Sequence, residues 1–328
     1  MELTEERKNT TINQAELSRL WLDLSNLEDV TIEQYHQYTD EARKAGLLDD
    51  ITFYYEERQG KMKRSIDRTF RLLKYMEERR IDRTSAFFRS TILKMNLAGP
   101  LTFHAVLFVT TMRLLATDEQ LRYWNPRVEN YDDVIGTYAQ TELGHGSDVQ
   151  SLETTAHYDP VTKTFTINSP TITAAKFWPG GLGVVANHAV LQAGTYSNGR
   201  YLGIQTFIVP IRDIKSHEPL PGVTVGDIGS KFAFDAVDNG FLLLKNVRVP
   251  RDYMLMRYAT VNEDGSFTEA SPKAKQLAYG GMLNTRLDIV RDAANYLARS
   301  ATIVTRYSLV RRQFGEGSQE KQILDYQT

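Results

Sequence analysis

The sequence contains no cysteine and only six histidines among its 328 residues. Without thiols the chain can form no disulfide, no thiolate metal site and no cysteine nucleophile. No two histidines lie four residues apart, the spacing that places two metal ligands on one helix face, so we expect no metal site. The chemistry is therefore expected to come from an organic cofactor or from residues that no local pattern marks.

A strong charge of one sign and a long apolar run are also missing. Thirty-nine basic and 41 acidic residues leave a formal net charge of −2, which argues against a nucleic-acid-binding surface. No stretch of about 18 consecutive apolar residues occurs, so no ordinary membrane span is expected. The opening MELTEERKNT lacks the apolar core of a secretory signal and the composition of a transit peptide. The length fits two or three domains of about 150 residues each.

Residues 1–133 are typical of helices, because charged residues are dense, glycine is scarce and the first proline is Pro100. Basic residues cluster in 61–90 but alternate with acidic ones, which favours a solvated helix face over an anion-binding patch. The apolar stretch 99–116 predicts a buried helix that begins near Pro100. His104 within that stretch is expected to be a core histidine with its hydrogen bonds satisfied.

Residues 134–273 differ from the first zone in composition and in the length of their segments. Short segments such as KTFTINSP and YLGIQTFIVPI are rich in β-branched and aromatic residues and are separated by turn formers. Asp159 and Pro160 mark the turn of a hairpin between two of these strands. Because no helix-length pattern interrupts the strands, an antiparallel barrel or sandwich is favoured over a parallel α/β sheet.

In the last zone, 274–328, the residues from about Tyr279 predict one long helix with an apolar stripe on a single side, which is broken at Gly315 to Ser318. The stripe consists of Leu283, Leu287, Val290, Ala294, Leu297, Ala301 and Val304. A lone helix cannot bury such a stripe, so we expect the start of a helical bundle that is incomplete in this chain. The chain is accordingly expected to be part of a longer protein.

Two local motifs carry candidate chemistry. In TYAQTELGHGSD, residues 137–148, a strand opens into a loop where Gly144 and Gly146 would let backbone amides approach a flat or anionic ligand. The alternative is a glycine-rich hairpin turn with polar decoration. In KFWPGGLG, residues 176–183, Trp178 either lies against a planar cofactor ring or is a core aromatic at a strand end.

In this order and spacing, the two motifs resemble the flavin-binding strands of the acyl-CoA dehydrogenase and oxidase superfamily. Several further segments resemble the oxidase branch: SLETTAHYDP, FIVPIRD, PLPGVTVGDIGSKF, DNGFLLLKNVRVPRDYMLMRY and RYSLVRRQF. The resemblance implies an α+β multidomain fold of the acyl-CoA dehydrogenase type. Its parts would be an N-terminal helical domain (1–133), a central antiparallel β-barrel (134–273) and the first part of a C-terminal helical bundle (274–328).

The resemblance also implies the cofactor FAD, held across the interface of a homodimer. Gln140 and Thr141 would touch the flavin ring, and Trp178 and Gly180 would line its other approach. Ser147 would make a polar contact toward the acyl-CoA, although the GSD of this chain is closer to the dehydrogenase pattern than to the threonine usual in oxidases.

Two residues near the end of the chain complete the implied site. Arg311 and Gln313 match residues that reach the FAD of the neighbouring subunit, where an arginine suits a pyrophosphate. Without the resemblance, they read as a basic cap at a helix C-terminus.

The activity implied is α,β-desaturation of a fatty acyl-CoA to the trans-2-enoyl-CoA, with O2 reduced to H2O2, in the peroxisome. The family's catalytic glutamate is expected beyond Thr328, so no catalytic residue is assigned in this chain and the chain alone is expected to be inactive. One alternative is an acyl-CoA dehydrogenase, which passes its electrons to a flavoprotein. The other is a truncated, non-catalytic protein that binds acyl-CoA or flavin.

Overall fold

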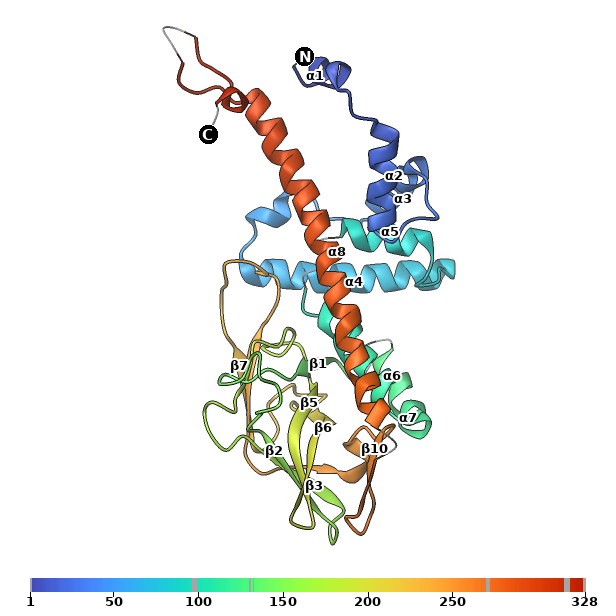
Figure 1. Ribbon diagram of the computed structural model, residues 1–328, viewed down its shortest axis with the longest axis vertical. Coiled ribbons are helices and arrows are strands. Elements are labelled where there is room, and N and C mark those ends of the chain that lie inside the picture. Colours follow the sequence, from blue (N-terminus) through green and yellow to red (C-terminus); the bar gives the residue numbers. More distant parts are fainter. Residues whose placement is uncertain are drawn as a thin grey trace. The chain divides into compact units, whose positions relative to one another are not determined.

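The computed structural model describes residues 2–95, 99–129, 131, 133–269, 272–315 and 319–326. The chain divides into two compact units, which Figure 1 shows in the colours of the sequence. Unit 1 contains Met1–Lys44, Ile81–Lys94 and Leu283–Thr328, and unit 2 contains Ala45–Arg80 and Met95–Met282. The domain boundaries expected after residues 133 and 273 stay predictions.

Unit 1 is helical. Its elements are α1 (Glu2–Asn9), α2 (Gln14–Leu24), α3 (Ile32–Lys44), α5 (Ala86–Lys94), the part of α8 (Pro272–Val310) from Leu283 onward, and the 3₁₀ turn η4 (Ile323–Asp325). Helix α2 begins where the Asn13 side chain accepts hydrogen bonds from two backbone amides at 3.1 and 3.3 Å. Helix α3 begins with a reciprocal pair, in which the Thr31 and Gln34 side chains each accept from the other's amide. Leu22, Leu27 and Tyr35 are buried between these helices.

The long helix α8 confirms the helix predicted from the apolar stripe. The stripe itself is uncovered, since Leu287, Val290 and Leu297 are 62–70% exposed. The Leu283 side chain lies outside the described residues. A polar side chain of α8 is buried instead: Asn295 is 8% exposed and accepts a hydrogen bond from the Ser25 hydroxyl at 3.1 Å. The apolar stripe therefore has no cover within the described part of unit 1.

Unit 2 begins with helices. They are η1 (Ile51–Tyr55), α4 (Arg58–Arg79), the π-helical turn η2 (His104–Phe108), α6 (Val109–Leu115) and α7 (Asp118–Val128), with the 3₁₀ turn η3 (Arg251–Tyr253) later in the chain. The buried helix predicted after Pro100 is thus confirmed, with a π-helical turn in its first half. His104 is 1% exposed; its Nε2 contacts the Val128 carbonyl oxygen at 2.9 Å, and its Nδ1 accepts from the Gly136 amide at 2.8 Å. It is a satisfied core histidine, as expected.

The basic stretch 61–90 is largely a solvated helix face, because Lys63, Arg71 and Lys74 on α4 are exposed. Arg68 is the exception. Its side chain is 2% exposed and forms an ion pair with Asp49. No helix within the described ranges is both long enough and apolar enough to cross a membrane.

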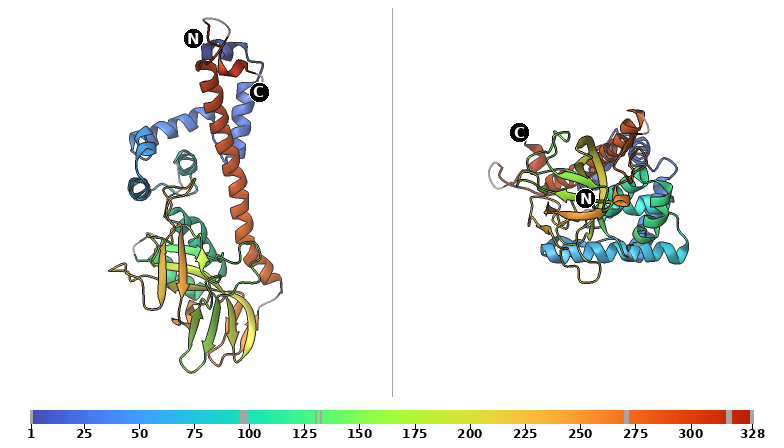
Figure 2. Two further views of the ribbon diagram at one scale, coloured as in Figure 1. Left: turned by 90° about the vertical axis from the view of Figure 1, so that its left-hand side faces the viewer. Right: turned by 90° about the horizontal axis from the view of Figure 1, so that it is seen from below.

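The strands of unit 2 form one large sheet and two small ones. They are β1 (Gly136–Ala139), β2 (Thr155–Asp159), β3 (Thr164–Asn168), β4 (Lys176–Phe177), β5 (His188–Ser197), β6 (Arg200–Pro210), β7 (Val223–Asp227), β8 (Gly240–Leu244), β9 (Val247–Pro250), β10 (Ala259–Val261) and β11 (Phe267–Glu269). The large sheet has the order β1-β5-β2-β3-β9, with β6 also paired to β5. A second sheet has the order β4-β8-β7, and β10 pairs with β11. Figure 2 shows these strands, mostly green to orange, curling beside one another.

The antiparallel sheet that the sequence favours is found in part: β1 and β2 both pair with β5 in parallel, whereas the other pairings of the large sheet are antiparallel. Parallel neighbours need a crossover connection, and the chain supplies one in the long stretches that lead from β1 and from the β2–β3 hairpin to β5. The strands themselves were recognisable, but nothing in their local composition encodes which way two distant strands will pair.

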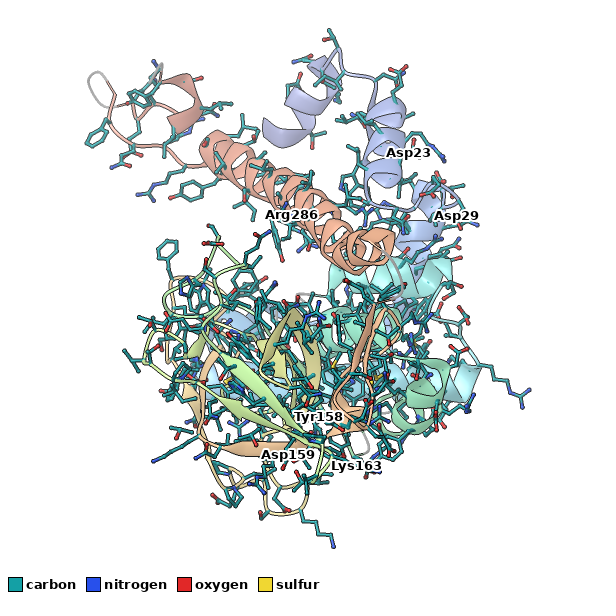
Figure 3. The ribbon with its side chains drawn as sticks, turned by 60° about the horizontal axis from the view of Figure 1, so that its bottom comes forward. Asp23, Asp29, Tyr158, Asp159, Lys163 and Arg286 are labelled. Atoms are coloured by element: carbon teal, nitrogen blue, oxygen red, sulfur yellow. The ribbon has the colours of Figure 1, made fainter. Side chains whose placement is uncertain are left out.

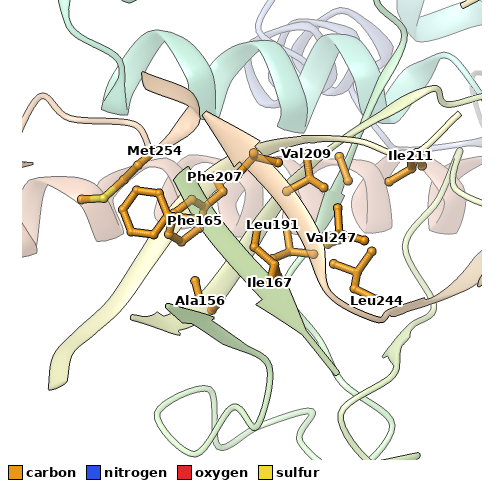
Figure 4. Close-up of a cluster of buried hydrophobic side chains, with 14 of the residues drawn as sticks. Ala156, Phe165, Ile167, Leu191, Phe207, Val209, Ile211, Leu244, Val247 and Met254 are labelled. Carbon is orange, nitrogen blue, oxygen red and sulfur yellow. The ribbon is translucent and has the colours of Figure 1, made fainter. Parts of the chain in front are cut away.

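The β2–β3 hairpin confirms the predicted turn at Asp159–Pro160. Thr155 through Asp159 pair antiparallel with Asn168 through Thr164, and the Asp159 carboxylate accepts from the Val161 amide at 2.9 Å. Tyr158, Asp159 and Lys163 are labelled at this end of unit 2 in Figure 3. Apolar side chains from the strands, among them Phe165, Leu191 and Phe207, form the core drawn in Figure 4.

Candidate functional site

The structure brings the two candidate motifs together in unit 2. The Phe177 amide donates to the Thr141 carbonyl at 3.0 Å, and Glu142 and Lys176 form an isolated antiparallel bridge. The Leu143 amide continues the contact by donating to the Ala175 carbonyl at 2.8 Å. Residues 140–144 and 173–178 are therefore neighbours in space, although some 30 positions separate them in the sequence.

Gln140 takes part in a closed ring of side-chain hydrogen bonds. The Tyr138 hydroxyl donates to Gln140 Oε1 at 3.0 Å, Gln140 Nε2 donates to Gln192 Oε1 at 2.9 Å, and Gln192 Nε2 donates to the Tyr138 hydroxyl oxygen at 2.8 Å. The ring fixes the orientation of the Gln140 amide and leaves it a second N–H and a second lone pair for a ligand.

Thr141 offers an unused hydroxyl. The side chain is half-buried, and none of the described residues hydrogen-bonds its oxygen, while its carbonyl is taken by Phe177. A half-buried hydroxyl without a protein partner loses free energy unless water or a ligand supplies one. Thr141 is thus available to a ligand, and its predicted contact with the flavin ring stays a prediction.

Trp178 has an unusual backbone conformation and an exposed ring. Its φ is +85°, which is costly for a residue with a large side chain. The conformation is held from both sides: the Trp178 amide donates to the Gly240 carbonyl at 2.9 Å, and the Asn239 side chain donates to the Trp178 carbonyl at 2.7 Å. The side chain is 52% exposed and stacks on Phe177 at a centroid distance of 6.4 Å. It is not a core aromatic, so the alternative interpretation of this motif is wrong.

Gly180 is required by its close packing. A Cβ atom at this position would lie 2.3 Å from the Phe103 ring, so any side chain would push the turn away from that ring. The Gly180 carbonyl accepts a hydrogen bond from the Thr137 hydroxyl at 2.8 Å. That bond ties the turn after Trp178 to strand β1, which carries the other candidate motif.

A buried ion pair beneath both motifs was not identified from the sequence. Lys176 and Glu142 are 0% and 2% exposed, and Lys176 Nζ lies 3.0 Å from Glu142 Oε1. The same ammonium donates to the carbonyls of Gln140 at 3.1 Å and Gln192 at 2.8 Å. It therefore has three acceptors, which use all of its N–H groups.

The Glu142 carboxylate likewise has several hydrogen-bond partners. Glu142 accepts from the Glu153 amide at 2.7 Å and from the Thr154 amide and hydroxyl at 3.0 and 2.5 Å. Burial alone would raise the pKa of Glu142, but the Lys176 ammonium and these hydrogen bonds outweigh it and hold the pKa below its usual value. Burial lowers the pKa of Lys176 to about 8. Both groups are charged at pH 7, and the pair locks strand β1 and strand β4 to β5.

The glycine-rich loop after Glu142 differs in part from the expectation. The Gly144 amide donates to the Thr173 carbonyl at 2.9 Å and is not available to a ligand. Gly146 has open space where a Cβ would stand. Ser147 is exposed, and its side chain has no hydrogen-bond partner among the described residues. Its predicted contact with acyl-CoA stays a prediction.

Arg311 and Gln313 belong to unit 1, directly after α8 ends at Val310. Both side chains are exposed. Their backbones are held, since the Ile323 amide donates to the Arg311 carbonyl at 3.0 Å and the Tyr326 hydroxyl donates to the Gln313 carbonyl at 2.9 Å. Their predicted reach to a cofactor stays a prediction. Within the part of the chain that the structure describes, no group of three or more His, Cys, Asp or Glu side chains could hold a metal ion.

Comparison with known families covers both ends of the chain. Residues 30–133 match the family described as "Acyl-coenzyme A oxidase N-terminal", and residues 279–328 match "Acyl-CoA oxidase, C-alpha1 domain". Among curated proteins, the chain is 46% identical over 236 residues to peroxisomal acyl-coenzyme A oxidase 1 of Phascolarctos cinereus. The aligned region covers 71% of this chain and 35% of the relative.

Solved structures show the same likeness over nearly the whole chain. Acyl-CoA oxidase 1 of Arabidopsis thaliana superposes with a TM-score of 0.83 at 38% identity, covering 99% of this chain and 49% of that one. Acyl-CoA oxidase-2 of Caenorhabditis elegans, solved bound with FAD, ascaroside-CoA and ATP, gives 0.84 at 36% identity with the same coverage. The chain thus spans about a third of the curated relative and about half of each solved chain.

Proposed function

Because this chain belongs to the acyl-CoA oxidase family, we propose that the protein carrying it is an FAD-dependent acyl-CoA oxidase. The reaction is the α,β-desaturation of a fatty acyl-CoA to the trans-2-enoyl-CoA, with molecular oxygen reduced to hydrogen peroxide. This is the first step of peroxisomal β-oxidation, and the peroxisome is the proposed location because the curated relative is named peroxisomal.

The observation that carries the proposal is that the Trp178 ring and the Thr141 hydroxyl lie on neighbouring segments. An aromatic ring that is half exposed sits on a backbone held at φ +85°, next to a strand end with an unpartnered hydroxyl. Strain of this kind persists where the surrounding structure over-determines it, and it concentrates at ligand sites. A flat face beside a polar edge suits an isoalloxazine ring, so the residues present fit FAD.

The chain's own residues have distinct roles in this proposal. When bound, FAD supplies the hydride acceptor and passes the electrons on to oxygen. Thr141 and Gln140 hydrogen-bond the ring edge, where a donor stabilises negative charge. Trp178 and Gly180 close the other approach and exclude water. Ser147 contacts the acyl-CoA.

The proposed assembly is a homodimer that shares FAD across its interface. Arg311 and Gln313 would reach the cofactor of the neighbouring subunit, the arginine through its fork of N–H donors to a pyrophosphate. The exposed apolar stripe of α8 supports the need for further helical partners, because an amphipathic helix gains most of its stability by packing.

Glu142 is not the base that removes the α-proton. It is 2% exposed and its carboxylate accepts four hydrogen bonds, one of them from a buried ammonium. A general base must reach its proton directly or through one water, and this carboxylate is buried, with its charge already paired with the Lys176 ammonium. The family's catalytic glutamate is proposed to follow Thr328 in the full-length protein.

The test uses the full-length protein, purified and loaded with FAD. An anaerobic addition of long-chain acyl-CoA should bleach the flavin absorbance, and admitting air should restore it with formation of hydrogen peroxide. The matching 2-enoyl-CoA is the control, because it is already desaturated and should cause no bleaching. Bleaching that persists in air would identify an acyl-CoA dehydrogenase instead. A protein that takes up no FAD would contradict the proposal and favour a non-catalytic role.

A further inference from the structure

The turn that carries Trp178 and Gly180 continues into residues 182–186, which we call the clamped loop. The clamped loop connects β4 to β5 and belongs to neither strand. A buried backbone must still find partners for its N–H and C=O groups. In this loop most of those partners are two charged side chains that come from distant parts of unit 2.

Arg212, two residues after β6, holds the carbonyl side of the clamped loop. Its side chain is 5% exposed, and its guanidinium donates to the carbonyls of Leu182 at 3.1 Å, Gly183 at 2.8 Å and Ala186 at 2.5 Å. The planar fork of an arginine can satisfy several carbonyls of one turn at once. The Arg212 amide also donates to the Asn187 carbonyl at 3.1 Å, which anchors the arginine to the start of β5.

Asp238, two residues before β8, holds the amide side of the same loop. It is 0% exposed, and one carboxylate oxygen accepts from the amides of Val184 and Val185, both at 2.8 Å. Its backbone carbonyl accepts from the Gly183 amide at 2.9 Å. The second carboxylate oxygen is buried and accepts no hydrogen bond from the described residues. Burial of the Asp238 carboxylate therefore costs desolvation free energy, and only one of its two oxygens recovers part of that cost through hydrogen bonds.

Backbone hydrogen bonds connect the clamped loop to the turn that carries Trp178. The Ala186 amide donates to the Gly181 carbonyl at 2.8 Å, and the Gly240 amide, two residues after Asp238, donates to the Pro179 carbonyl at 3.0 Å. Gly240 also accepts from the Trp178 amide. The strained conformation of Trp178 is thus tied to the same backbone that Asp238 anchors.

We propose that Arg212 and Asp238 are positioning residues that hold the Trp178 turn in its ligand-binding shape, an inference that rests on the proposed flavin site. Neither side chain needs to touch the cofactor. A turn that only had to fold could be filled more cheaply by apolar packing, because two buried charges cost desolvation free energy. Hydrogen bonds from a rigid fork and a carboxylate fix the loop's shape, which a planar ligand demands.

The experiment compares two matched pairs of variants in the full-length protein. Arg212→Met and Asp238→Leu remove the hydrogen bonds, whereas Arg212→Lys and Asp238→Asn keep donors or an acceptor of similar size. Arg200→Met, which alters an exposed arginine on β6, is the control. The apoproteins are titrated with FAD, and the absorption spectrum of the bound flavin is recorded at saturation.

Arg212→Met and Asp238→Leu should each raise the Kd for FAD about tenfold or more and change the spectrum of the bound flavin, since several charge-assisted hydrogen bonds are lost. Asp238→Asn, whose single oxygen can still accept from both valine amides, should stay within about threefold of the wild type. Arg212→Lys should lie between the wild type and Arg212→Met, because a lysine lacks the planar fork, and the control should match the wild type. Variants that melt at a lower temperature yet bind FAD with the wild-type Kd and spectrum would show a merely structural role and overturn the proposal.

A second measurement needs no variant. In the wild type, FAD should slow hydrogen exchange at the Val184 and Val185 amides about tenfold, because occupancy of the turn would stabilise the loop that Asp238 holds. FAD binding that leaves the exchange of both amides unchanged would overturn the inference while leaving the proposed function intact. If the wild type binds no FAD at all, the proposed function fails and this inference falls with it.

Discussion

Lys176→Met should destabilise unit 2 strongly, because the lysine is the buried partner of Glu142. The substitution keeps the length of the side chain but removes three hydrogen bonds at 2.8–3.1 Å, two of them to carbonyls and one to the carboxylate. Breaking one side of a buried ion pair typically costs about 3–5 kcal/mol. We expect about 3 kcal/mol, at the lower end, since Glu142 keeps the hydrogen bonds from Glu153 and Thr154.

A double variant separates the ion pair from simple packing. In Glu142→Gln with Lys176→Met, no charge is left buried. The glutamine oxygen can still accept from the Thr154 amide and hydroxyl, while its NH2 group takes the place of the oxygen that accepts from the Glu153 amide. The cost of the double change should be smaller than the sum of the two single costs by about 1–3 kcal/mol. The reason is that Glu142→Gln removes the buried, unpaired carboxylate charge that Lys176→Met alone would leave behind.

The assay is native-state hydrogen exchange of the full-length protein in increasing denaturant, measured at the backbone amides of strand β5, which belongs to unit 2. Lys163→Met is the control, because this lysine lies on the exposed β2–β3 turn and should change stability by no more than about 0.5 kcal/mol. Single-variant costs that add to within about 0.5 kcal/mol would refute the coupling between the two charges.

Three further outcomes follow from the same contacts. Gly180→Ala should lower the stability of unit 2 in urea unfolding by about 1–3 kcal/mol, because its Cβ would meet the Phe103 ring at 2.3 Å, whereas Gly146→Ala, with nothing within 4 Å, should be close to neutral. Thr141→Val should weaken the FAD Kd about threefold to tenfold in a flavin titration, and Thr141→Ser should not, since only the hydroxyl is used. Between pH 8 and 10.5 the unfolded Lys176 binds a proton that the folded one does not, so wild-type stability should rise with pH relative to Lys176→Met by up to about 3 kcal/mol. A constant difference across that pH range would contradict the lowered pKa.

The elements of this fold were predictable where local chemistry dictates them. The turn at Asp159 was recognisable because an aspartate that caps its own turn needs only neighbours in sequence. The long helix α8 was recognisable from its spacing of apolar residues. The parallel pairing of β1 with β5 was not, because the pairing direction depends on a crossover and on the packing of the whole sheet.

The candidate site shows the same division. Thr141 and Trp178 were predicted because they belong to motifs with a recognisable order, and the structure places the two segments that carry them side by side. The supporting residues were not found. Lys176 and Glu142 are separated by 34 positions, and Arg212 in FIVPIRD reads as an ordinary charged residue after a strand. Burial of a charge is decided by tertiary contacts, so composition and spacing carry no signal for it.

The most direct test of the proposed flavin site is a crystal structure of the full-length protein with FAD bound. We predict that the Thr141 hydroxyl hydrogen-bonds the isoalloxazine ring at about 3 Å, with the Trp178 indole against the ring and φ of Trp178 still near +85°. A flavin bound away from residues 140–141 and 178–180, or a Trp178 turn that rearranges to an ordinary conformation when the cofactor binds, would contradict it.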